Sequence, residues 1–165
     1  QLTVAALARS IGHRPATLIA GIAVCCATAA FAGYAAMLIS PLLTAPARLF
    51  MAALALGFAG LEALILPPVR DVKEATHSLA AQTFVLLAHQ LTDAARFLIF
   101  GVALAADAQM PAAIGGGIGG VLLLAAAWAA PEEFTWQRLR PIRRGLGAAM
   151  LLLGIWLGLR AIGYV

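Results

Sequence analysis

The sequence has few charged residues. Asp, Glu, Lys and Arg make up 11% of its 165 residues, whereas soluble domains carry about 25%. Hydrophobic residues make up 63%, and the mean hydropathy is +0.96. A soluble domain of this size does not bury that much apolar surface. The composition therefore predicts an integral membrane protein and argues against a soluble one.

Cysteine and recognisable catalytic patterns are also scarce. The two cysteines, Cys25 and Cys26, are adjacent within an apolar segment, which argues against a structural disulfide or a cysteine-bound metal. The sequence has no histidine-rich metal spacing, no Ser–His arrangement and no paired-aspartate signature. It thus predicts neither an enzyme nor a bound cofactor.

Long apolar runs are what the sequence has in abundance. Five of them are long enough to span a bilayer, which needs about 20 apolar residues. They are predicted as helices over 16–39, 47–66, 79–106, 112–130 and 145–162. Residues 1–10 are apolar but too short to span, and we expect the natural chain to begin upstream of Gln1. The predicted fold is all-α, with five full transmembrane helices after a truncated first helix.

The basic residues are distributed unevenly between alternate loops. Those of one face are Arg9, Arg14, Arg70, Lys73, Arg138, Arg140, Arg143 and Arg144, and those of the other are Arg48 and Arg160. By the positive-inside rule the richer face is cytoplasmic, so we expect both termini on the opposite side of a bacterial inner membrane. The formal charge of +4 then reflects orientation and does not indicate binding to nucleic acid.

The two halves of the sequence resemble each other. PATLIAGI at 15–22 matches PAAIGGGI at 111–118 at four of eight positions, and GLEA at 60–63 matches GLRA at 158–161 at three of four. The halves are residues 1–66 and 79–165, joined by a cytoplasmic linker over 67–78. Three helices in each half make the second copy inverted relative to the first. Inverted repeats are typical of secondary transporters, whose sites form at mid-membrane between the repeats.

The middle of the run 79–106 carries polar residues that are costly in a membrane. Asp93 and Arg96 each cost about 2.5–3.5 kcal/mol there on insertion scales. In a continuous helix, His89, Asp93 and Arg96 share one face at i, i+4 and i+7. Two interpretations follow: a site or proton relay that lines a cavity between the repeats, or an Asp93–Arg96 pair that neutralises itself and holds the helix in the bundle. Glu62, near the cytoplasmic end of its run, is predicted to be interfacial and solvated.

The same stretch resembles a family motif. Gdt-type divalent cation/proton antiporters have six helices in two repeats, each opening with E-x-G-D-(K/R)-(S/T). Here the second copy aligns as QLTDAA over 90–95, where Asp93 keeps the aspartate, Gln90 stands for the glutamate and Thr92 for the glycine. The HRP loop at 13–15 and the closing span around GIW at 154–156 are similar to the family as well.

The resemblance implies export of Mn²⁺ or Ca²⁺ in exchange for protons. Asp93 would bind the ion, Gln90 and Thr92 would add neutral oxygens, and His89 and Arg96 would serve as proton relay or counter-ion. The expected partners are the lipid bilayer, the divalent cation, protons and a second copy of the chain. The alternative is a non-transporting membrane module that packs with a partner subunit, since the motif is altered and the glycines at 115–120 favour close helix packing.

Overall fold

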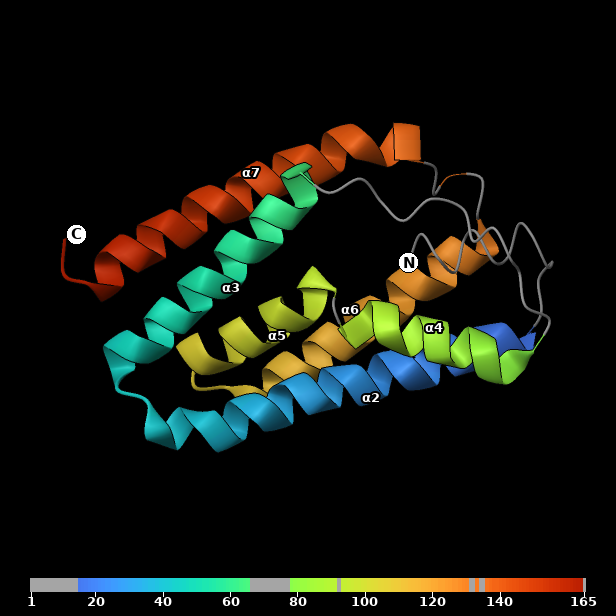
Figure 1. The fold of residues 1–165 in the computed structure, drawn as a ribbon, viewed down its shortest axis with the longest axis horizontal. Helices are drawn as coiled ribbons and strands as arrows, with labels where there is room; N and C mark the ends of the chain where they lie inside the picture. Colours follow the sequence, from blue (N-terminus) through green and yellow to red (C-terminus); the bar gives the residue numbers. More distant parts are fainter. Residues whose placement is uncertain (1–14, 66–77, 92, 131–132, 134–135, 165) are drawn as a thin grey trace.

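The computed structural model describes residues 15–65, 78–91, 93–130, 133 and 136–164. Every regular element in this part of the chain is a helix, which confirms the all-α class. The predicted first helix and nearly all of the linker over 67–78 lie outside the described residues. The elements, in chain order, are α2 (Pro15–Ile39), the short 3₁₀ helix η1 (Ser40–Leu42), α3 (Ala45–Ile65), α4 (Leu79–Leu91), α5 (Ala94–Ala105), α6 (Gln109–Ala129) and α7 (Trp136–Ala161) (Figure 1).

Four helices within the described residues are long and apolar enough to cross a membrane. They cover Pro15–Leu42, Ala45–Ile65, Gln109–Ala129 and Leu139–Ala161. Proline stands at the start of the first and in the opening turns of the next two, where its missing N–H removes no helical hydrogen bond. These helices match four of the five predicted spans and fit an integral membrane protein.

The fifth predicted span is not one helix. Helix α4 ends at Leu91 and helix α5 begins at Ala94; they have 13 and 12 residues, and each is shorter than the bilayer needs. Asp93 has an extended backbone (φ −73°, ψ 134°), and its side chain accepts a hydrogen bond from the N–H of Ala95. A short acidic side chain of this kind favours a helix start over a helix interior. The prediction of a continuous helix over 79–106 is therefore wrong.

Helix α7 begins earlier than predicted. The sequence predicts this helix from residue 145, but the helix already covers Trp136–Arg144 and has Pro141 inside it. Arginine is a good helix former, and Pro141 lies only five residues after the helix start, where it disturbs few hydrogen bonds. The apolar run marks the membrane-spanning part of α7 and not the full helix.

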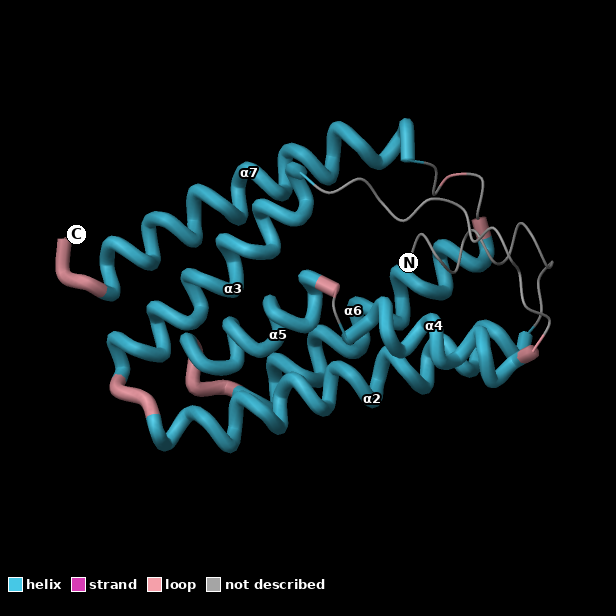
Figure 2. Tube along the Cα trace, in the orientation of Figure 1, coloured by secondary structure: helices cyan, strands magenta, loops and turns pink. Residues whose placement is uncertain are grey.

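Helix α5 lies at the centre of the structure. It packs against α2, α3 and α6, while α2 also packs along α6 and α3 along α7. The α2–α3 turn, the α5–α6 turn and the C-terminal end of α7 lie at one end of the bundle (Figures 1 and 2). We call this the Asp107 end and the opposite one the Arg143 end. The broken helix α4–α5 thus places its break in the interior of the bundle.

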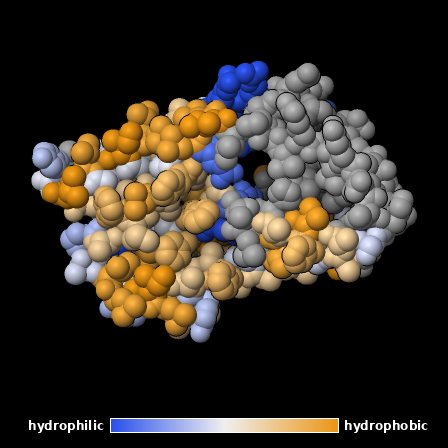
Figure 3. Space-filling view, viewed as in Figure 1, coloured by the Kyte–Doolittle hydropathy of each residue, from blue (hydrophilic) through white to orange (hydrophobic). Residues whose placement is uncertain are grey.

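The helices approach closely because their contact faces are small. Most of the buried residues are alanines or glycines, and large apolar side chains such as Phe31 (63% exposed) and Phe84 (72%) cover the outside (Figure 3). At Gly60 an added Cβ would lie 2.7 Å from the backbone O of Gly147 and the backbone N of Leu151. Small residues inside and large apolar residues outside are the arrangement expected of helices packed in lipid.

Candidate functional site

Two carboxylates meet at the helix break. Asp93 caps the N-terminus of α5 with its own side chain, whose Oδ1 lies 3.4 Å from the N of Ala95. Glu62, from the last turns of α3, lies beside the same N-terminus, where the N–H of Ala94 and the charge of Asp93 both act on its carboxylate. Both side chains are half-buried. The partial positive charge of a helix N-terminus stabilises such anions.

Glu62 was not predicted to be part of this site. The sequence suggested a solvated side chain at the interface, because Glu62 stands only five residues before Pro67. In the structure it packs against α5 because α3 runs along that helix. The available signal was an acidic residue within an otherwise apolar helix, which by default indicates a function.

Arg143 of α7 adds a positive charge on the α3 side of the break. Its Nη2 donates to the backbone O of Glu62 at 3.2 Å, and its charge acts on the Glu62 carboxylate. The α3 side of the break therefore gathers two acids and one arginine, contributed by three helices.

Arg96 lies on the α2 side of the same helix start. It is buried, with 8% of its surface exposed, and its Nη2 donates to Oε1 of Gln90 at 2.8 Å and to Sγ of Cys25 at 3.3 Å. Thr28 also donates to Gln90 Oε1, at 3.4 Å, and Gln90 Nε2 donates to the backbone O of Gly21 at 3.5 Å. Arg96 thus has neutral partners from α2 and α4.

The predicted Asp93–Arg96 pair does not form within the described residues. The break turns Asp93 into the cap of α5, while the Arg96 side chain points to Gln90 and Cys25. The shared face predicted for His89, Asp93 and Arg96 required a continuous helix, so that prediction is wrong too. The break separates an acidic side that faces α3 from a basic side that faces α2.

The structure describes only part of the other predicted site residues. Gln90, predicted as an ion ligand, lies beside the break, but its Oε1 already accepts from Arg96 and Thr28. Thr92 lies outside the described residues, and so does the side chain of His89, whose backbone belongs to α4. Their roles as ion ligand and proton relay remain predictions.

The described residues contain no group of three or more His, Cys, Asp and Glu side chains placed to hold a metal ion. Glu62 and Asp93 are two carboxylates, whereas Ca²⁺ takes six to eight oxygen ligands. Backbone carbonyls at the end of α4 and water are the remaining oxygen sources at a helix break. The arrangement suits a cation that keeps part of its hydration shell.

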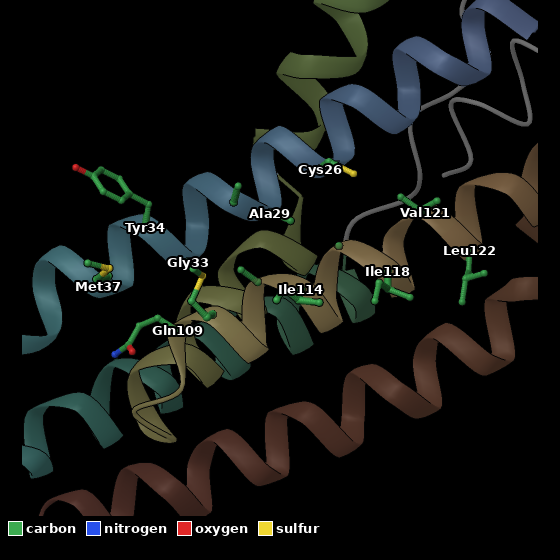
Figure 4. Close-up of a pocket in the computed structure, with 14 residues that line it drawn as sticks. Cys26, Ala29, Gly33, Tyr34, Met37, Gln109, Ile114, Ile118, Val121 and Leu122 are labelled. Atoms are coloured by element: carbon green, nitrogen blue, oxygen red, sulfur yellow. The ribbon is translucent and has the colours of Figure 1, made fainter.

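Two apolar grooves lie elsewhere in the described structure. An apolar groove of about 560 Å³ runs between α2 and α6, lined by residues such as Ala29, Gly33 and Ile118, with Tyr34 and Gln109 toward the Asp107 end (Figure 4). A smaller one of about 240 Å³ lies between α3 and α7 beside Gly57. Neither is lined by Glu62 or Asp93, so neither groove is the candidate ion site.

Comparison with known proteins adds no identification. No protein-family model, no curated protein and no solved structure matches the chain. The resemblance to Gdt-type antiporters therefore stays a prediction from the motif around Asp93.

Proposed function

We propose that this protein is a secondary transporter that exports a divalent cation, Mn²⁺ or Ca²⁺, in exchange for protons. The ion is bound by the carboxylates of Glu62 and Asp93 at the break between α4 and α5. One observation carries the proposal: two acidic side chains from different halves of the chain converge on the N-terminus of a half-helix inside an apolar bundle.

The chemistry of this pair suits exchange. Two ionised carboxylates attract a hard divalent cation, which prefers oxygen ligands. Protonation removes the negative charge and with it the attraction, so protons and the cation compete for the same oxygens. When the site holds no cation, the N-terminus of α5 stabilises the negative charge. Discontinuous helices with such ends form the ion sites of many transporters.

The packing supports an inverted repeat. The sequence offset of 98 that relates Gly60 to Gly158 also relates Ala53 to Leu151. Gly60 approaches Leu151, and Gly158 approaches Ala53. Each of these contacts becomes the other when every residue is replaced by its counterpart in the other half. A pseudo-two-fold axis between α3 and α7 produces such a pair of contacts.

The helix pair α2–α6 follows the same pattern. Gly21 approaches Leu124, and Gly117 approaches Ala29. Gly21 and Gly117 are 96 residues apart, while Ala29 and Leu124 are 95 apart. Helices α2 and α3 of the first half thus each pack against their counterparts α6 and α7 in the second half. This supports two inverted repeats and five crossings, with α4 and α5 together forming the broken one.

The second candidate is a non-transporting membrane module. The observation that favours it is Arg96, a buried cation held by neutral groups, one of which is Gln90, the residue that stands where the family motif has a glutamate. In that case the polar residues at the break stabilise the bundle, and the acids at α5 are only helix caps. The two candidates differ in whether the purified protein moves ions.

The test is Mn²⁺ flux into proteoliposomes under an imposed pH gradient. The wild type is compared with D93N, E62Q and the control E133Q, which removes an acid from an exposed position. We expect D93N and E62Q each to lower the flux by about tenfold or more, because each removes half of the site's fixed negative charge. E133Q should stay near the wild type. A wild type without flux would favour the non-transporting module, and flux that both site variants leave intact would place the ion site elsewhere.

A further inference from the structure

Arg143 differs from the other arginines at its end of α7. It is half-buried and touches α3, whereas Arg140 and Arg144 are exposed. Its Nη2 lies 3.2 Å from the backbone O of Glu62, one turn before the end of α3. Of these three arginines, it is the one that the fold places at Glu62.

The backbone of Arg143 is fixed by close helix packing. One turn further along α7, a Cβ added at Gly147 would lie 2.9 Å from the Cβ of Ala63 and 3.1 Å from the backbone O of Gly60. Such a contact leaves α7 little freedom to slide or turn against α3. The guanidinium is therefore held at Glu62 by two rigid elements, and its charge acts on that carboxylate.

We propose that Arg143 is a tethered cation of the ion site, whose charge competes with the divalent ion for Glu62 and Asp93 and weakens its binding. This inference rests on the proposed function. A transporter must release its ion as well as bind it, and two carboxylates in a low-dielectric interior hold a divalent cation strongly. A fixed positive charge beside them lowers that affinity.

Arginine suits this role better than lysine or histidine. Its guanidinium stays protonated at every physiological pH, so the competing charge is not lost when protons exchange at the carboxylates. The same charge partly neutralises the two acids when no ion is bound, which lowers the cost of keeping them within the bundle.

A purely structural role for Arg143 is the main alternative. An arginine near a helix C-terminus often donates to the last carbonyls, and the contact with the Glu62 backbone O has this form. Two substitutions separate charge from hydrogen bonding. R143Q keeps an N–H donor but removes the charge, and R143K keeps the charge but removes the planar guanidinium.

The experiment is a Mn²⁺ titration of the full chain in lipid nanodiscs at pH 8, with wild type, R143Q, R143K and R144Q. R144Q is the matched control, because it removes one arginine from the next, exposed position. We expect R143Q to bind Mn²⁺ about three- to tenfold more tightly, since a nearby unit charge is no longer opposed to the ion. R143K and R144Q should stay within about twofold of the wild type.

The outcomes separate this inference from the proposed function. A wild type that binds no Mn²⁺ overturns the proposed function and this inference with it. If the wild type binds Mn²⁺ and R143Q does not bind it more tightly, the inference alone fails. It also fails if R143K tightens Mn²⁺ binding as much as R143Q, because the geometry of the guanidinium and not its charge would then set the affinity. The same holds if R144Q tightens binding as much as R143Q.

Discussion

Gln90 and Arg96 join the two half-helices across their break. Arg96 Nη2, in the first turn of α5, donates to Gln90 Oε1, in the last turn of α4, at 2.8 Å. Gln90 is also tied to α2 through its bonds with Thr28 and the backbone O of Gly21. This hydrogen bond fixes the ends of α4 and α5 relative to each other. It also means that Gln90 Oε1 already has an arginine as its partner.

Replacing Gln90 should therefore destabilise the bundle. Q90A leaves the buried Arg96 guanidinium without its shortest hydrogen bond, and an unsatisfied buried charged group costs about 2–3 kcal/mol. We expect a clear drop in the midpoint of thermal unfolding in detergent. Q109A is the control, because Gln109 makes an exposed hydrogen bond to Asp107, whose loss should lower the midpoint much less than the loss of a buried one. Equal midpoints for Q90A and the wild type would show that the contact contributes nothing to stability.

Asp93 is expected to have separable structural and charge roles. Asparagine is as good an N-cap as aspartate, whereas alanine at an N-cap costs about 1 kcal/mol. D93N should thus unfold at nearly the wild-type temperature while losing Mn²⁺ flux, and D93A should lose both flux and stability. Circular dichroism melts beside flux assays on the same preparations test this. A D93N variant as unstable as D93A would mean that the charge, and not the cap, stabilises the start of α5.

The Asp107 end should depend on pH through one carboxylate. Asp107 accepts hydrogen bonds from Gln109 and Ser40, both at 3.1 Å, and pairs with Arg48 at 2.9 Å. These hydrogen bonds, first those of Gln109 and Ser40 and then that of Arg48 with its charge, lower the pKa of Asp107 below its usual value of 3.8. The resulting stability is present above that value and is lost as the pH falls through the lowered pKa.

D107N tests this prediction without straining the backbone. Asp107 has a positive φ of 50°, a conformation that asparagine also tolerates. The wild type should unfold at a higher temperature than D107N at pH 7, and the difference should shrink as the pH falls below about 4. Thermal melts from pH 7 to pH 3 measure it. A difference that stays constant down to pH 3 would contradict a contribution from the ionised carboxylate.

Gly60 should tolerate no side chain. An added Cβ would lie 2.7 Å from two backbone atoms of α7, so G60A forces α3 and α7 apart and should cost about 1–3 kcal/mol. G57A is the matched control three residues earlier in the same helix, where an added Cβ meets nothing within 4 Å. It should be neutral or stabilising, since alanine favours helix over glycine. The unfolding midpoints of both variants in one detergent decide the comparison, and equal losses would contradict the close α3–α7 contact.

The helices themselves were largely predictable from the sequence. Apolar runs of sufficient length marked four membrane-spanning helices, because the hydropathy of a run is a local property of the chain. The helix break was harder to predict. Asp93 is a good helix cap and indicates a helix start, whereas the apolar residues around it indicate one continuous helix. These two local signals conflict.

The sequence by itself determined that this is a chain of apolar helices with costly polar residues near the middle of the run 79–106, since composition and run length are properties of the chain alone. Only the tertiary structure decided what those residues face. Glu62 lies 31 positions before Asp93 and Cys25 lies 71 before Arg96, and such pairs form only when α3 and α2 pack against α5. The acidic and basic sides of the break are therefore a result of helix packing, because no local pattern encodes which helix lies against which.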